Sequence, residues 1–257
     1  MSGHEVVAVD NLISGGGGIH HSRWRDFALP QRDNFQPLLA DVRRYFEEHS
    51  SEFFDLVIHL AAVVGGRLTI ERNPLVIAED LSIDAAFWRW ACAAKPGHIV
   101  SFSSSAAYPV ALQTVDKSQL LKESDLNFSS TLGTPDLTYG WAKLTHEYLG
   151  TIASDKYGLK VATYRPFSGY GNDQDSSYPF RAICERALHR VTDKEGRFYV
   201  WGSGDQRRDF VHIEDIVSFV MQSYPRMTNG LGVNISTGIL TSFRELATDR
   251  KSTRLNS

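Results

Sequence analysis

The chain of 257 residues has few cysteines, no long apolar run and no excess of basic charge. Its two cysteines, Cys92 and Cys184, have neither the paired spacing of a metal site nor the number needed for a disulfide framework. No apolar run reaches the roughly 18 residues of a membrane span, and residues 1–5 lack the basic and apolar regions of a signal peptide. A net charge of −3 and a pI of about 6.3 exclude the basic surface typical of nucleic-acid-binding proteins. These absences predict a cytoplasmic protein with neither a membrane nor a nucleic-acid partner.

What the sequence does contain is an alternation of strand-like and helix-like segments. Residues 74–94 and 139–157 have helical periodicity. The short apolar runs around them are residues 6–10, 55–60, 98–102 and 159–164. This alternation predicts a Rossmann-like, doubly wound α/β fold with a mainly parallel sheet. Ligands of such sheets bind beyond the carboxyl ends of the strands, so we expect the site there.

The two ends of the chain complicate this plan. In a dinucleotide-binding βαβ unit an acidic residue ends the second strand, and Asp10 has this place. We therefore expect a first strand, a Gly-rich turn and a helix, roughly 20 to 30 residues in all, to precede the chain. The glycines at 15–18 follow Asp10, so we predict a flexible loop there. The predicted units are an incomplete NAD-binding domain (1–166), a substrate-binding region partly interleaved with it (167–248) and a non-native tail (249–257).

The candidate catalytic groups are Tyr139, Lys143 and the serines at 103–105. In a helix, residues 139 and 143 lie one turn apart on the same face. A lysine ammonium beside a phenol favours the phenolate and lowers the tyrosine pKa, which is normally about 10. The serines follow the strand at 98–102, at its carboxyl end. A serine hydroxyl aimed at the same point completes a proton-transfer site for a sugar hydroxyl or carbonyl.

Five segments together resemble the NAD-dependent epimerase/dehydratase family, the nucleotide-sugar-modifying branch of the extended short-chain dehydrogenases/reductases. The segments are residues 57–62 (VIHLAA), 103–109 (SSSAAYP), 139–143 (YGWAK), 165–171 (RPFSGYG) and 200–212 (VWGSGDQRRDFVH). The resemblance covers residues 3–247. It implies an enzyme that binds NAD rather than NADP, acts on a nucleotide-diphosphate sugar and forms a homodimer through the helices at 74–94 and 140–157.

The resemblance also implies roles for individual residues. Ser104 matches the family's catalytic serine, with Ser105 as the alternative. The implied dinucleotide contacts are Asp10 and Asn11 at the ribose, Asp41 and Val42 at the adenine, Leu60, Ala61 and Ala62 along the cofactor, Tyr139 and Lys143, and Pro166 near the nicotinamide. The implied substrate contacts are Ser105, Ser168, Tyr178, Trp201 and Arg208. Arg208 would clamp the diphosphate, because a guanidinium fork matches phosphate geometry. Trp201 is either a contact of the nucleotide base or a core aromatic residue.

Departures from the family pattern select among its reactions. The 3,5-epimerases have a cysteine two positions after the catalytic serine and a histidine or lysine opposite it, where this chain has Ala106 and Tyr178. The 4,6-dehydratases have an Asp-Glu pair where this chain has Ala106 and Ala107, and Asp80-Leu81 replaces the usual Asn-Asn. C4 epimerisation needs only the serine, the tyrosine, the lysine and NAD.

We therefore expect a 4-epimerase, an isomerase with oxidoreductase-type chemistry that works through a 4-keto sugar. The alternatives are a reductase or dehydratase of the same family, a non-catalytic NAD-binding protein and an inactive fragment. The histidines at 4, 20 and 21 have no ligand spacing with a carboxylate or a cysteine, so no metal site is expected.

Overall fold

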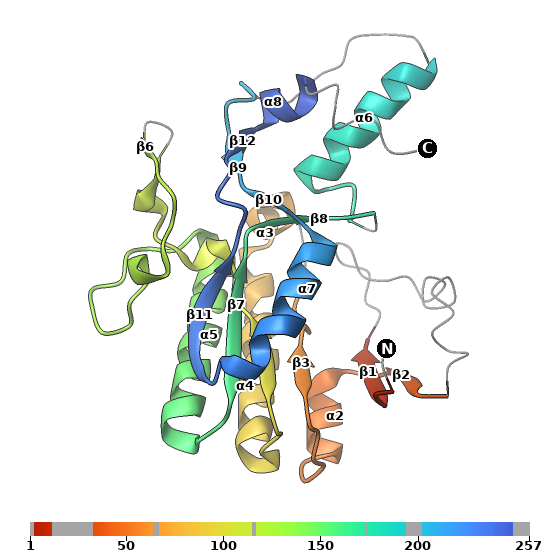
Figure 1. Ribbon diagram of the computed structural model, residues 1–257, viewed down its shortest axis with the longest axis vertical. Coiled ribbons are helices and arrows are strands. Elements are labelled where there is room, and N and C mark those ends of the chain that lie inside the picture. The colour runs from red at the N-terminus through yellow and green to blue at the C-terminus, as the bar shows by residue number, and fades with distance from the viewer. Residues whose placement is uncertain are drawn as a thin grey trace.

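The centre of the molecule is a parallel sheet of four strands in the order β11-β7-β4-β3 (Figure 1). This computed structural model describes residues 3–11, 33–63, 67–114, 117–172, 174–193 and 202–248. The four strands are β3 (Val57–His59), β4 (Ile99–Phe102), β7 (Val161–Pro166) and β11 (Asn229–Ile235). Val57 lies opposite Ile99, which in turn lies opposite Val161. The predicted α/β fold with a parallel sheet is confirmed.

Helices cover both faces of this sheet. Successive residues of a strand point to opposite faces, and Ile99 accordingly packs with Phe87 in one core while Val100 packs with Ile216 in another. The helices of the first core are α2 (Val42–Glu48), α4 (Ile77–Ala94) and α5 (Leu137–Tyr157), and the second core lies under α7 (Ile213–Ser223). Burial on both faces explains why β4 and β7 are mainly apolar instead of alternating between apolar and polar residues.

β1 (Val6–Asp10) and β2 (Phe35–Leu39) form a separate parallel pair. Their residues Val9 and Leu38 pack against the first core. Within the described ranges neither strand of this pair is paired with β3, so the sheet consists of two pieces. Ile58 on the edge strand β3 is 44% exposed. The preceding strand and Gly-rich turn remain a prediction, and the glycines at 15–18 lie outside the described residues.

The chain after Pro166 does two things. It adds α7 and β11 to the layers of the sheet, and it builds a smaller group of elements beyond the carboxyl ends of the strands (Figure 1). That group consists of β8 (Ser168–Tyr170), α6 (Pro179–Asp193), β9 (Arg207–Arg208), β10 (Phe210–His212), β12 (Thr241–Ser242) and α8 (Phe243–Thr248). β8 pairs with β10 in parallel, and β9 pairs with β12 in antiparallel orientation. The sequence analysis did not predict α6, α7 or β11.

Short elements connect these parts. They are α3 (Arg67–Arg72), β5 (Gln113–Thr114), β6 (Lys117–Ser118) and 3₁₀ turns at Pro74–Val76, Ser105–Ala107, Val110–Leu112, Glu123–Asp125 and Tyr224–Arg226. The long helix α5 ends at Gly158, as the sequence predicts, because this glycine takes a left-handed conformation (φ +70°) and its N–H donates to the carbonyl of Ser154. None of the helices in the described ranges is both long enough and apolar enough to cross a membrane.

Candidate active site

Tyr139 and Lys143 lie together near the start of α5. The Lys143 Nζ is 5.6 Å from the centre of the Tyr139 ring. Lys143 is only 9% exposed, whereas Tyr139 is half-buried. The helix that the spacing predicted is confirmed. The ammonium thus lies over the face of the phenol ring, at the distance of a cation–π contact.

The serines reach α5 from the carboxyl end of β4. The buried Ser103 donates its hydroxyl to the carbonyl of Lys143 at 3.4 Å. Ser104 caps the 3₁₀ turn at Ser105–Ala107 by accepting the N–H of Ala106 at 3.1 Å. This turn packs directly on Gly140, where a Cβ atom would overlap the carbonyl oxygen of Ala106. A glycine beside Tyr139 therefore allows the serine turn to contact the first turn of α5.

A buried ion pair also fixes α5 to the sheet. Arg165 on β7 donates from Nε to Glu147 Oε2 at 2.9 Å and from Nη1 to the Tyr108 hydroxyl at 2.8 Å. Tyr108 donates in turn to Asn234 Oδ1 on β11 at 2.8 Å. Burial alone would lower the pKa of Arg165, but the Glu147 carboxylate outweighs burial and raises it. The sequence analysis missed Glu147, although its place four residues after Lys143 puts both on one face of α5.

Tyr178 approaches Tyr139 from the segment that leads into α6. Burial is the main cause that raises the pKa of the Tyr178 phenol, and the negative charge of an ionised Tyr139 raises it further. Tyr178 therefore remains a neutral phenol at neutral pH.

Arg208 lies on β9, which belongs with α6 to the group of elements beyond the carboxyl ends of the strands. Its side chain is exposed, and its Nη1 donates to the carbonyl of Arg207 at 2.9 Å. The next residue, Asp209, is buried and accepts the N–H groups of Thr237 and Gly238 at 2.9 and 2.7 Å. The Asp209 carbonyl also accepts the N–H of Ser168 at 2.9 Å. Asp209, which the sequence analysis missed, thus holds two predicted substrate residues in place, while Trp201 lies outside the described residues.

Apart from Tyr139 and Lys143 on α5, the predicted dinucleotide residues lie at or just after the carboxyl ends of strands. The positions are Asp10 and Asn11 after β1, Asp41 and Val42 after β2, Leu60, Ala61 and Ala62 after β3, and Pro166 at the end of β7. Asp41 caps α2 by accepting the N–H of Arg43 at 2.9 Å, and a side-chain hydrogen bond from Arg43 lowers its pKa. Because Arg43 engages this carboxylate, we expect the backbone at Asp41 to contact an adenine.

One comparison decides the family. The model of the NAD dependent epimerase/dehydratase family matches residues 1–235. The chain belongs to this family.

Relatives in the NAD-dependent epimerase/dehydratase family catalyse different reactions. The chain is 24% identical to GDP-L-colitose synthase of Yersinia pseudotuberculosis, over 89% of this chain and 76% of that protein. It is 26% identical to UDP-glucose 4-epimerase of Mycolicibacterium smegmatis, over 96% of this chain and 74% of that protein. Among solved structures it is similar to the dTDP-glucose 4,6-dehydratase DesIV of Streptomyces venezuelae with NAD bound, with a TM-score of 0.75, 19% identity and coverage of 95% and 69% of the two chains. This likeness confirms the Rossmann-like fold.

The described residues fit both ends of the cofactor that gives the family its name. Asp10, Asn11 and the turn after β2 suit an adenosine, while Tyr139, Lys143 and Pro166 suit a nicotinamide riboside. Residues 60–62 lie between these groups, at the end of β3. In the described part of the chain no Gly-rich turn leads from a strand into a helix N-terminus, which is the usual cradle of the pyrophosphate.

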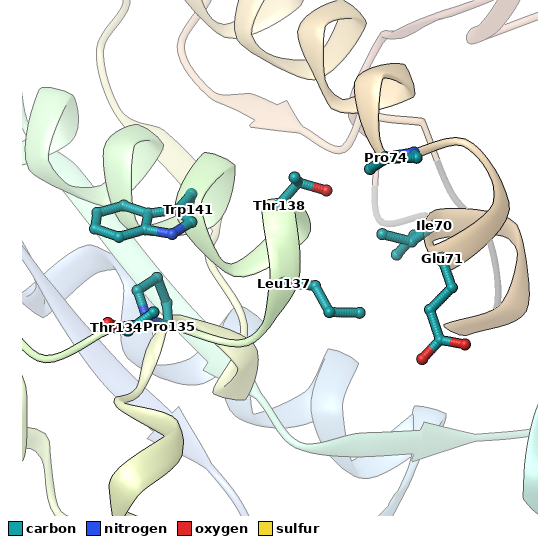
Figure 2. A pocket seen from close by; sticks show the side chains of 8 residues that line it. All are labelled: Ile70, Glu71, Pro74, Thr134, Pro135, Leu137, Thr138 and Trp141. Atoms are coloured by element: carbon teal, nitrogen blue, oxygen red, sulfur yellow. The ribbon is translucent and has the colours of Figure 1, made fainter.

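A cavity of about 420 Å³ lies beside the site, between α3 and the start of α5 (Figure 2). Leu137, which has a left-handed backbone (φ +52°), points toward Ile70 across it. The lining residues are Ile70, Glu71, Pro74, Thr134, Pro135, Leu137, Thr138 and Trp141. None of the predicted site residues lines this cavity, so we do not assign it to the reaction.

Proposed function

We propose that this chain is an NAD-dependent nucleotide-sugar epimerase that inverts C4 through a 4-keto intermediate. The observation that carries the proposal is the packing of the serine turn on the turn of α5 that bears Tyr139, with Lys143 beneath the phenol. The small side chains of Ala106 and Ala107 on this turn supply no acid for eliminating water. The relatives support a nucleotide-sugar substrate, since they include a UDP-glucose 4-epimerase.

In this proposal Tyr139 acts as a phenolate and takes the proton of the sugar C4 hydroxyl. Ser104 shares the hydrogen bond to that oxygen, and Lys143 stabilises the phenolate and holds the nicotinamide ribose. When bound, NAD supplies the reversible two-electron oxidation of C4. The keto sugar then turns its other face toward the cofactor, and C4 is reduced on that face while Tyr139 returns the proton. The product is therefore the C4 epimer, and no net oxidation occurs.

The remaining predicted residues hold the two ligands. The proposed dinucleotide contacts are Asp10, Asn11, Asp41, Val42, Leu60, Ala61, Ala62 and Pro166. We propose that Arg208 binds the diphosphate and that Ser105, Ser168 and the neutral phenol of Tyr178 hydrogen-bond the sugar. Trp201 is proposed for the nucleotide base.

The test is the Tyr139→Phe variant. We expect it to keep its fold and to lose at least about 100-fold in kcat, because the proton-transfer group is removed. C4 inversion would be followed by proton NMR on UDP-, GDP- and dTDP-hexoses with added NAD. Tyr148→Phe, on the exposed face of the same helix, is the matched control and should retain activity. Full activity of Tyr139→Phe would refute the assignment.

A relative that is 24% identical, a dTDP-4-dehydro-6-deoxy-D-allose reductase of a Streptomyces species, makes reduction of a 4-keto sugar the second candidate reaction. Both reactions use Tyr139 and Lys143, but only the reductase consumes one reduced nicotinamide for each sugar. Loss of NADH absorbance during turnover separates the two. Thermal melting with and without NAD separates both from a chain that binds no cofactor, because a ligand of the native state raises its stability.

We also propose that two chains pair through α4 and α5. Large apolar side chains are exposed along these helices and the turn before α4: Leu75 (79%), Leu81 (41%), Trp141 (51%) and Tyr148 (46%). A second copy that covers them would remove this apolar surface from water. Light scattering should find a dimer that Trp141→Glu converts to a monomer. A monomeric parent protein at micromolar concentration would contradict the proposal.

A further inference from the structure

A cluster of buried polar side chains lies beneath Lys143. It comes from three elements: β3, α4 and α5. Its members are His59, Asp80, Asp84, Lys143 and His146, each between 1% and 9% exposed. We call it the buried cluster. Apart from Lys143, none of these residues has a part in the proposed reaction.

Asp84 is the centre of the buried cluster. One of its oxygens, Oδ1, lies 3.0 Å from Nε2 of His59 and 3.0 Å from Nδ1 of His146. The His59 ring stacks on Phe87 with the ring centres 4.0 Å apart, and the His146 ring packs against Trp88 at 5.2 Å. The carboxylate on α4 is therefore held from the sheet on one side and from α5 on the other.

The charge of Asp84 is well defined. Burial lowers the pKa of His59 to about 4, so His59 is a neutral donor at neutral pH. Burial would raise the pKa of Asp84, but the interactions with the His146 and His59 imidazoles outweigh burial and hold that pKa below its usual range. Asp84 is thus a fixed carboxylate in a site without solvent, where charges interact strongly.

This carboxylate lies next to the turn of α5 that carries Lys143. His146 follows Lys143 by three residues, so the two side chains are neighbours on the helix surface. The positive charge of Lys143 acts on both His59 and Asp80. The charged or titratable groups near Lys143 and Asp84 are Tyr139, His146 and Glu147 on α5, Asp80 on α4 and His59 on β3. Glu147 is neutralised by Arg165, which leaves Asp84 and Asp80 to balance the ammonium.

The ligand atoms of His59, Asp84 and His146 lie within 4.8 Å of one another, which also suits a metal ion. The geometry does not require one. Both imidazoles lie 3.0 Å from one carboxylate oxygen, and His59 is hydrogen-bonded to it.

We propose that Asp84, held between His59 and His146, is a positioning residue: it fixes the turn of α5 that carries Lys143 and supplies the buried negative charge that balances the ammonium. This inference rests on the proposed function only in taking Tyr139 as the base. A negative charge beside the Tyr–Lys pair opposes ionisation of Tyr139. We therefore expect removal of this charge to favour the phenolate.

The test is the Asp84→Asn variant, which removes the charge and keeps the shape. We expect the midpoint for ionisation of Tyr139 to fall by about one pH unit, because a like charge is lost. Tyrosinate absorbance would be measured against pH, with the matching Tyr139→Phe protein subtracted to isolate this residue. The acid limb of kcat/KM should move in the same direction by the same amount.

Three comparisons keep the outcome clear. Glu79→Gln removes an exposed charge from α4 and should move the midpoint by less than about 0.2 unit, because solvent screens it. If Asp84→Asn does not fold, the triple variant His59→Leu, Asp84→Leu, His146→Leu leaves no member of the trio unpaired, and it should show the same fall. A midpoint that stays within about 0.2 unit or rises would overturn the proposal. One equivalent of a metal ion in the purified protein that Asp84→Asn releases would also overturn it.

The absorbance titration needs no substrate. A fall in the midpoint combined with an active Tyr139→Phe enzyme would refute the proposed function and leave the coupling of Asp84 to Tyr139 intact. An unchanged midpoint combined with an inactive Tyr139→Phe enzyme would refute the coupling of Asp84 to Tyr139 and leave the proposed function intact.

Discussion

Two buried charged groups contact α5, and they differ in how completely they are satisfied. Glu147 and Arg165 form a closed pair, in which Arg165 also donates to Tyr108. The buried cluster, by contrast, is open. Asp80 Oδ2 and both ring nitrogens of His146 have no hydrogen-bond partner in the described part of the chain.

The difference separates a structural role from a functional one. A closed pair holds two elements together and leaves no charge to act on its surroundings. An open cluster loses stability through its unsatisfied atoms, and its net charge acts on the neighbouring Lys143. Perturbed and unsatisfied groups of this kind are typical of active sites.

Breaking the closed pair should have the largest effect on stability. Arg165→Met leaves the Glu147 carboxylate buried and uncompensated, so we expect the free energy of unfolding to fall by about 3 to 5 kcal/mol. Urea denaturation followed by circular dichroism measures this change. Arg165→Met combined with Glu147→Leu is the matched control, and it should recover most of the loss because no charge remains. A loss of less than about 1 kcal/mol in the single variant would show that the pair does not hold α5 to β7.

The closed pair also shows where sequence reasoning stops. The spacing of Tyr139 and Lys143 is local, and so the sequence predicted the helix that carries them. Glu147 and Arg165 meet through the packing of α5 on β7, and no local pattern shows this contact. The same holds for Asp84, whose partners come from residues 25 positions earlier and 62 positions later.

The sequence did not predict β11, again because the contacts that explain this strand join residues far apart in the chain. Its sequence contains Gly230 and Gly232, and glycine inside a strand normally argues against one. Tertiary contacts require both. A Cβ atom on Gly232 would lie 2.6 Å from Arg165 Nε and 2.7 Å from Glu147 Oε1, and one on Gly230 would lie 2.6 Å from the carbonyl oxygen of Gly150. The glycines make room for the ion pair and for α5, so their reason is visible only in the folded chain.

Removing a charge from the open cluster should raise the free energy of unfolding, by less than the loss expected for Arg165→Met. Burial raises the pKa of Asp80, the charge of Asp84 adds to this, and the Val63 N–H and Lys143 oppose it. The folded state therefore holds the Asp80 proton more tightly than the unfolded state does. Stability is lost as the pH rises from the usual aspartate pKa of about 3.9 through the raised value, and the loss is complete above it.

Asp80→Asn removes this loss and keeps an oxygen to accept the Val63 N–H, which now lies 2.5 Å from Oδ1. We expect the free energy of unfolding at pH 7 to rise by about 1 kcal/mol, with the gain shrinking as the pH falls toward the usual aspartate pKa. Glu79→Gln, the exposed neighbour on the same helix, should change stability by less than about 0.5 kcal/mol. If Asp80→Asn is instead less stable at pH 7, the attraction between Lys143 and the Asp80 carboxylate outweighs the cost of burying that carboxylate. The cluster would then be closed in the same sense as Glu147 and Arg165, and the contrast between the two groups would fail.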